Sequence, residues 1–130
     1  MRSHQFDRSS RSSTPAEEWS AGCLAWRLVD EPAVSIAEEE MAAGTQESWH
    51  LHDFATQYFY VLSGGIEVRV TGEVVSLAAR EGALVRPGTL HQVANCSDMP
   101  ATFLVLSAPP TKLDRRAATR PEDHVEDPSE

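Results

Sequence analysis

Short runs of β-branched and aromatic residues, separated by turn residues, fill the middle of the chain. In one run, Ile66, Val68 and Val70 alternate with Glu67 and Arg69, which is typical of a strand with one face in water. The runs lie at 23–30, 33–41, 57–64, 66–71, 74–77, 83–86, 91–95 and 102–107. About eight short strands with tight turns and no long helical period favour an all-β sandwich or barrel.

The two ends of the chain differ from this middle part. Residues 1–19 are rich in serine and arginine, and residues 112–130 are charged and include Pro121 and Pro128. Segments of this composition have little apolar surface to bury, so we expect flexible polar tails at both ends. A chain of 130 residues therefore predicts one domain, at 20–111, between two tails.

Charge and cysteine content restrict the partners and the type of site. The formal net charge is -9 and the middle of the chain has no cluster of lysine or arginine, which argues against nucleic acid and anionic membranes as partners. The start has no apolar stretch and no run approaches the length of a membrane span, so we expect a cytoplasmic protein. Cys23 and Cys96, the only cysteines, are too far apart for a multi-cysteine zinc site.

Three of the five histidines fall in the predicted folded part. His50 and His52 leave the same face of a strand, at a spacing that allows two imidazoles to bind one metal ion. His91 follows a turn and opens the run 91–95. Gln57 lies an odd number of residues after His52, so the loop 53–56 has to bring it back to the histidine face. Any metal site here depends on imidazole and oxygen ligands.

These residues resemble the two characteristic motifs of the cupin superfamily. The first motif contains two glycines, two histidines and an amide at fixed intervals: Gly44, His50, His52, Gln57 and Gly64. The end of the second motif is matched by Gly88, His91 and Asn95. The resemblance covers roughly residues 26–110. It implies a double-stranded β-helix, or jelly roll, with one divalent metal ion at the mouth of the barrel.

The resemblance also implies the ligands and the pocket. The ligands would be His50, His52, His91 and the residue at position 57. Alternation places Gln57, Phe59 and Val61 on one strand face, and we expect Phe59 and Val61 to line the substrate pocket. Imidazole suits iron, manganese, nickel, zinc and copper, so the sequence leaves the identity of the metal open.

Three positions depart from the family pattern. Gln57 stands where the family normally has a glutamate ligand, Arg80 replaces a glycine, and Arg86 replaces a proline. The last two changes concern turns and are expected to be absorbed locally. The amide of Gln57 is a weaker donor than a carboxylate and leaves the charge of the ion unneutralised. It therefore predicts weaker metal binding and a stronger Lewis acid.

Other side chains have two readings each. Gln57 is either a metal ligand or a group that orients a histidine or a water molecule. Glu39 belongs to a charge run that is most simply solvated, but alternation also allows it to reach the interior as an acid or base. Asn95 is expected to bond to backbone at a strand end rather than to a metal. Tyr58 and Tyr60 are expected on the opposite face from Gln57, in packing or a subunit interface.

The expected function is that of a metal-dependent enzyme acting on a small organic molecule, with dioxygenase-type or isomerase/cyclase-type chemistry. The alternative is a binding or sensing module without turnover, which is favoured because no evident general base lies outside the ligand set. A third reading is a structural dimer with a vestigial site. We expect a homodimer, because the face that carries Tyr58, Tyr60 and Leu62 needs cover.

Overall fold

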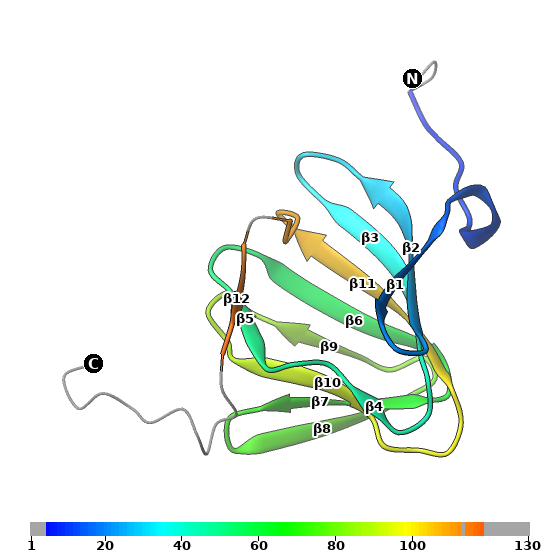
Figure 1. The fold of residues 1–130 in the computed structure, drawn as a ribbon. Coiled ribbons are helices and arrows are strands. Elements are labelled where there is room, and N and C mark those ends of the chain that lie inside the picture. The colour runs from blue at the N-terminus through cyan, green and yellow to red at the C-terminus, as the bar shows by residue number, and fades with distance from the viewer. Residues whose placement is uncertain (1–4, 113, 119–130) are drawn as a thin grey trace.

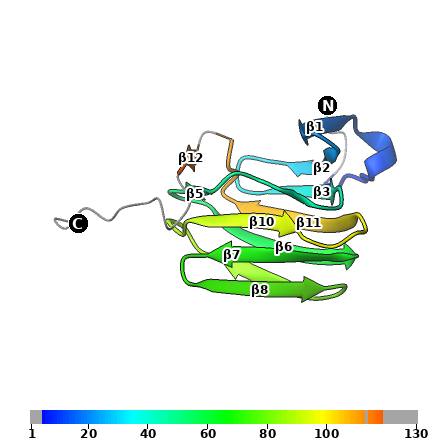
Figure 2. The same cartoon turned by 60° about the horizontal axis from the view of Figure 1, so that its bottom comes forward.

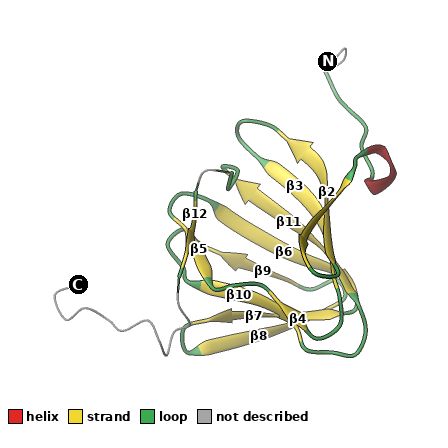
Figure 3. Ribbon diagram, viewed as in Figure 1, coloured by secondary structure: helices red, strands yellow, loops and turns green. Residues whose placement is uncertain are grey.

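The computed structural model describes residues 5–112 and 114–118 of the chain. Within them the backbone forms twelve strands and one short 3-10 helix, η1 (Arg11–Ser13). Figure 3 colours the strands yellow and this helix red. No helix in this described part is long and apolar enough to cross a membrane. The all-β prediction is confirmed.

The strands form two antiparallel sheets that face each other (Figures 1 and 2). The first sheet has the order β1-β2-β3-β11-β6-β9. Its strands are β1 (Ala16–Ser20), β2 (Cys23–Asp30), β3 (Ser35–Met41), β11 (Ala101–Ala108), β6 (Thr56–Ser63) and β9 (Gly82–Val85). The second sheet has the order β12-β5-β10-β7-β8, with β4 paired to β10. Its strands are β12 (Arg115–Ala117), β5 (His50–His52), β10 (His91–Asn95), β7 (Gly65–Val70), β8 (Glu73–Ala78) and β4 (Thr45–Gln46).

The core fills the space between the two sheets because apolar residues alternate along the strands. Every second residue of β11 from Ala101 to Ser107 is buried, and β6 buries Gln57, Phe59 and Val61 while Tyr58 is exposed. The largest fully buried side chains include Phe103, Met41 and Val61. All eight predicted strands are present, each with bounds that differ from the prediction by at most two residues.

Four further strands, β1, β4, β5 and β12, lie outside the predicted runs. β1 falls largely inside the predicted tail 1–19, and β12 falls inside the predicted tail 112–130, so the folded part is longer than 20–111. β1 pairs with β2, and its Trp19 packs against the core, which explains why this polar segment is ordered. β12 pairs with β5. Residues 1–4, 113 and 119–130 of the predicted tails lie outside the described residues.

The turn at Arg80 shows how the chain accommodates a residue that departs from the family pattern. Arg80 adopts a φ of 72°, the left-handed conformation that glycine favours. Its backbone N–H donates to the carbonyl of Val61 at 2.8 Å, and Glu81 accepts a hydrogen bond from the N–H of Val61 at 3.0 Å through its own carbonyl. The turn therefore keeps its geometry with an arginine in the glycine position, as expected.

Candidate metal centre

The three histidines of the folded part converge at one end of the sandwich. His50 and His52 lie on β5, and His91 begins β10 directly opposite His50 in the strand register. One ring nitrogen of each histidine lies within 4.8 Å of the others. All three side chains are buried. The i, i+2 spacing of the sequence thus produces the shared face that it predicts.

Backbone carbonyls fix the orientation of two of the rings. The Nδ1 atom of His50 lies 2.9 Å from the carbonyl oxygen of Ser48, and Nδ1 of His91 lies 2.8 Å from that of Thr89. A carbonyl only accepts, so Nδ1 carries the proton in both rings and Nε2 keeps its lone pair. The Nε2 atom of His91 is buried without a hydrogen-bond partner in the described structure.

The third ring completes a set of free nitrogen atoms that fits a metal ion. Nδ1 of His52 is also buried and makes no hydrogen bond to a described residue, while the ring has a hydrogen bond to the backbone of Asp114. Buried polar atoms are almost always satisfied, so unpartnered nitrogen lone pairs at one point indicate a missing partner. A divalent transition metal is the partner that imidazole donors suit.

Burial also sets the protonation state of the triad. Desolvation lowers the pKa of His50 to about 3 and that of His52 to about 4, and it lowers the pKa of His91 as well. The rings are therefore neutral near pH 7 without a metal ion. Neutral imidazole is the form that binds metal, so no proton has to leave these rings on binding at neutral pH.

Gln57 lies at the start of β6 and lines the same cavity as His50 and His52. Its Nε2 atom donates to the hydroxyl of Ser107 on β11 at 3.0 Å. Its carbonyl oxygen Oε1 is buried and has no hydrogen-bond donor among the described residues. The arrangement holds the amide with its acceptor atom free, as a fourth ligand requires, while the role of Gln57 as a ligand stays a prediction.

The loop between His52 and Gln57 is held by a residue that sequence reasoning did not identify. The carboxylate of Asp114 accepts hydrogen bonds from the backbone N–H groups of Asp53, Phe54 and Ala55 at 2.8 to 3.2 Å. These hydrogen bonds lower the pKa of Asp114 against the effect of desolvation. Asp114 thus holds the loop that returns Gln57 to the same face as His50 and His52.

We expect Asp114→Asn to weaken metal binding without removing any ligand. The amide has one acceptor oxygen where the carboxylate has two, so at least one N–H of the loop 53–55 loses its partner. The amides of this loop should exchange hydrogen faster than in the native protein, and the metal affinity should fall. Hydrogen exchange read by mass spectrometry, with Asp98→Asn as a control, checks this. Unchanged exchange at 53–55 would contradict it.

Two acidic side chains share a cavity with His50 and His52. An outer cavity of about 410 Å³ is lined by His50, His52, Gln57, Glu39 and Glu47, among others. A smaller inner cavity of about 60 Å³ is lined by Glu39, Glu47, His50 and Gln57 together with Trp19 and the apolar side chains of Phe59, Phe103, Val93 and Val105. Glu39 takes the interior position that alternation allowed. No local sequence pattern predicted that Glu47 and Trp19 would line this cavity.

Burial changes the protonation of both carboxyl groups. Desolvation raises the pKa of Glu39 to about 7, although the charge of Arg27 opposes the shift. Desolvation, together with the charge of Glu39, raises the pKa of Glu47 to about 8. Neither carboxyl belongs to the histidine cluster. The sequence offered no evident general base outside the ligand set, but tertiary packing buries two carboxyl groups beside His50, and one of them is Glu39, whose interior position alternation allowed.

We expect Glu39→Gln to change how stability depends on pH. The pKa of Glu39 is about 7 in the folded protein and 4.5 for an ordinary glutamate, so the native protein binds more protons than the unfolded chain between these pH values. The free energy of unfolding therefore falls as pH rises from 4.5 to 7, and glutamine removes this loss. Relative to the native protein, the variant should gain up to about 3 kcal/mol between pH 4.5 and pH 8. Urea unfolding of metal-free protein measures this, with Glu40→Gln as a control. A constant difference across pH would contradict it.

The two predicted pocket residues have different positions. Phe59 lines the inner cavity and lies with its ring centroid 6.2 Å from that of His91. Val61 is fully buried in the hydrophobic core and is not among the residues that line the cavities beside the triad. The strand carries Val61 into the space between the sheets, and its place in a substrate pocket stays a prediction.

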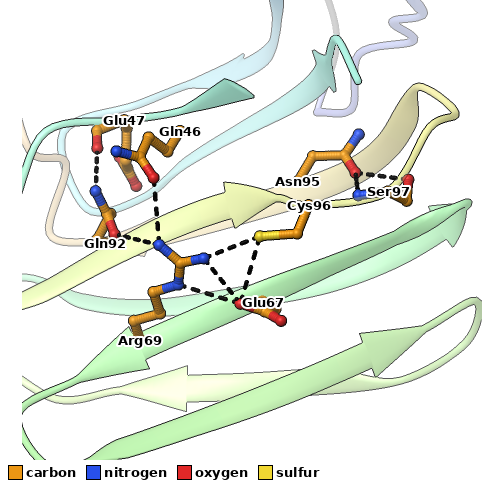
Figure 4. A network of polar contacts seen from close by, with 8 residues as sticks. All are labelled: Gln46, Glu47, Glu67, Arg69, Gln92, Asn95, Cys96 and Ser97. Carbon is orange, nitrogen blue, oxygen red and sulfur yellow. Dashed lines mark hydrogen bonds and ion pairs between the residues drawn. The ribbon is translucent and has the colours of Figure 1, made fainter. Parts of the chain in front are cut away.

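A polar network holds the wall of the cavity that carries Glu47 (Figure 4). Nη1 of Arg69 on β7 donates to the side-chain oxygens of Gln46 at 3.2 Å and Gln92 at 3.0 Å. Gln92 in turn donates to the carbonyl of Glu47 at 2.9 Å. The backbone N–H of Val93 donates to the carboxylate of Glu47 at 3.1 Å. Strands β7 and β10 therefore fix the segment that leads into His50.

Asn95, at the end of β10, has the structural role that the sequence predicts. Its Nδ2 donates to the carbonyls of Met41 at 3.1 Å and Met99 at 2.8 Å. Its Oδ1 accepts hydrogen bonds from the backbone N–H and the hydroxyl of Ser97. Asn95 is fully buried and joins the strand end to the following turn.

Several solved structures share this fold. The structure of KdgF from Halomonas sp. superposes with a TM-score of 0.76 over 83% of this chain and 97% of that chain, at 17% sequence identity. The polyketide cyclase RemF from Streptomyces resistomycificus superposes with a TM-score of 0.75 over 92% of this chain and 89% of that chain, at 19% identity. At these identities the likeness concerns the fold alone.

Two sequence comparisons agree with the structural ones. The tetracenomycin polyketide synthase protein TcmJ from Streptomyces glaucescens is 34% identical over 70 residues, which is 54% of this chain and 47% of that relative. The match therefore spans about half the length of the relative. Residues 37–107 match the family model of the cupin domain, and this segment contains the three histidines and both motifs. The chain belongs to the cupin family.

Proposed function

We propose that this protein is a metal-dependent enzyme that acts on a small carbonyl compound, with ring closure of a polyketide as the reaction. One observation carries the proposal. Three buried, neutral imidazoles with free nitrogen atoms converge on one point, and two of them, His50 and His52, line a cavity that also holds two buried carboxyl groups. A metal site beside groups that exchange protons near neutral pH suits carbon–carbon bond formation between carbonyl groups. The similarity to TcmJ and to the polyketide cyclase RemF supports this choice of substrate.

Different residues would bind the metal ion, exclude water and transfer protons. His50, His52 and His91 would hold the metal ion, with Gln57 as the fourth ligand, and the ion would supply Lewis acidity toward a carbonyl oxygen. Phe59, Phe103, Val93 and Val105 give the inner cavity an apolar wall that excludes water from the reacting atoms. The buried carboxyl groups supply sites that take up and return a proton.

A binding module without turnover is the alternative. The outer cavity is open and polar enough to bind a ligand without any reaction. A module of this kind would show saturable binding with no product. A dioxygenase would instead add oxygen to the substrate and depend on air.

One experiment separates these cases. Protein purified without chelator is analysed for metal and then incubated with a synthetic phenyl-1,3,7-triketone, whose carbon 2 can close a six-membered ring on carbonyl 7, in air and without oxygen, and the products are read by mass spectrometry. The proposal expects a cyclised product that has lost water, formed equally with and without oxygen and removed by chelator. A product that has gained oxygen would favour a dioxygenase. Binding of the triketone without any product would favour the binding module.

We also propose that the protein is a homodimer. Tyr58, Leu62 and Leu84 are exposed on the outer face of the first sheet, and Tyr58 lies opposite Leu84 in the strand register. An exposed apolar sheet face of this kind is typical of an interface. Light scattering should give twice the 14.3 kDa mass of one chain. Leu84→Asp should yield monomers, whereas Val74→Asp on the second sheet should not. A monomeric native protein at micromolar concentration would contradict the proposal.

A further inference from the structure

Two residues that line the inner cavity carry polar groups that the metal site does not use. The indole Nε1 of Trp19 is buried and makes no hydrogen bond to any described residue. The carboxyl group of Glu39 lines the inner and outer cavities and has no hydrogen bond or ion pair within the described residues. The first group only donates, and the second both gives and takes a proton. A buried donor without a partner indicates that something else satisfies it.

Glu39 differs sharply from its neighbours on β3. Glu38 and Glu40 point to the outer face, where both pair with Arg11 at 3.0 and 3.3 Å. Glu39 points inward between the apolar positions Ala25 and Phe103 of the adjacent strands. Arg27, whose charge reaches Glu39, is itself paired with Glu17 at 3.1 Å. The strand therefore holds one carboxyl group in the cavity while the matching groups on either side are neutralised outside.

The two groups come from separate strands and meet only in the folded protein. Trp19 lies on β1 and Glu39 on β3, with β2 between them in the sheet. Both line the outer and the inner cavity together with His50 and Gln57. A ligand that reaches His50 therefore also lies near Trp19 and Glu39.

We propose that Trp19 and Glu39 form the recognition and proton-transfer half of this site, and that they select substrates with an enolisable 1,3-dicarbonyl unit. The inference rests on the proposed function and names its substrate class and its base. A 1,3-dicarbonyl compound presents an acceptor oxygen for the indole N–H and, between its carbonyls, an acidic C–H group for the carboxylate. A simple alcohol or hydrocarbon satisfies neither group.

The step balances without any other reactant. The Glu39 carboxylate takes the proton from the carbon between the carbonyls, so a C–H bond breaks and an O–H bond forms on Glu39. The electron pair of the C–H bond becomes part of the enolate, whose oxygen accepts the hydrogen bond from Trp19. When the enolate carbon has attacked a second carbonyl of the same molecule, the protonated Glu39 returns its proton to the new alkoxide. No electron is gained or lost overall.

The chemistry of the cavity supports this assignment. A pKa of about 7 for Glu39 lets the group act as a base and then as an acid at neutral pH. The apolar wall formed by Phe59, Phe103 and Val105 keeps water away from the proton in transfer. An indole N–H in such a wall gives a stronger hydrogen bond than it would in water.

Ligand binding tests the recognition half without any turnover. 2-Hydroxyacetophenone is a stable, planar analogue of an enolised dicarbonyl, and its binding is measured by calorimetry to the metal-free and the metal-loaded full chain. Trp19→Phe keeps the aromatic ring and loses only the N–H, so binding should weaken about three- to tenfold in both forms. Trp49→Phe, a tryptophan outside the cavity lining, should bind like the native protein. Equal binding by Trp19→Phe would overturn the role of Trp19.

Proton exchange tests the role of Glu39. Diethyl malonate, a 1,3-dicarbonyl compound, exchanges the protons of its central carbon slowly in neutral D₂O, and metal-loaded native protein should accelerate this exchange as followed by NMR. Glu39→Gln should lose the acceleration by at least about 100-fold, the range that general acid–base groups contribute, while its binding of 2-hydroxyacetophenone persists. Glu40→Gln, the matched carboxyl group on the outer face, should exchange at the native rate.

The outcomes keep this inference apart from the proposed function. Native exchange that persists in Glu39→Gln, or that falls equally in Glu40→Gln, would overturn the role of Glu39 even if the triketone is cyclised. Exchange that depends on Glu39 without any cyclised product would support the inference and contradict ring closure. Native protein that binds metal but accelerates no exchange would overturn the proton-transfer role.

Discussion

His52→Ala should remove bound metal and leave the two sheets folded. The variant loses one of three imidazoles that converge within 4.8 Å, so the affinity for a divalent metal should fall at least about 100-fold. The fold should persist because the core is built from apolar residues between the sheets, such as Phe103, Met41 and Val61, and does not depend on the ion. Elemental analysis and circular dichroism measure both effects.

The matched control for this variant is His4→Ala, which removes a histidine outside the described residues. It should keep the native metal content. A His52→Ala protein that still holds one metal ion per chain would rule out the triad as the site. A variant that fails to fold would show instead that the ion is structural, in the manner of a zinc finger.

Local sequence patterns predicted which side chains of this site share a strand face, because such patterns follow from backbone geometry. The i, i+2 spacing of His50 and His52 determines a shared strand face whatever the rest of the fold does. Alternation in β6 likewise separated buried Phe59 from exposed Tyr58. His91 lies far away in sequence, and only the match of a second motif linked it to the first pair. The strand register that places His91 opposite His50 then explains the motif.

The remaining residues of the site leave no local pattern because their roles depend on tertiary contacts. Trp19 and Asp114 lie in polar segments whose composition predicts tails, and each is ordered by a partner far away in sequence. Glu47 follows a strand of two residues, too short for alternation to be visible. The orientation of Glu39 was ambiguous because three consecutive glutamates place a glutamate on both faces of the strand, and the sequence does not show which face is buried. All four residues belong to the site because tertiary contacts bury them there, and residue type alone does not reveal this.

Gln57→Glu should tighten metal binding by about tenfold or more if the amide oxygen is a ligand. The carboxylate is a stronger donor and adds one negative charge beside the ion. Ser107, whose hydroxyl now accepts from Nε2 at 3.0 Å, can rotate and donate to the new carboxylate, so the side chain keeps its position. The added charge also lowers the Lewis acidity of the ion, and we therefore expect cyclisation of the triketone to slow as metal affinity rises.

Gln46→Glu provides the control that separates ligation from general electrostatics. Gln46 also lines the outer cavity, so its variant adds the same charge near the ion without placing an oxygen at position 57. Metal titration by calorimetry at one fixed pH should then show a large gain for Gln57→Glu and a small one for Gln46→Glu. Equal gains in metal affinity for the two variants would mean that the carboxylate at position 57 acts only through its negative charge and does not bind the ion. Equal or weaker binding by Gln57→Glu than by the native protein would show that Oε1 of Gln57 does not bind the metal, and its buried, unpartnered state would then serve the substrate.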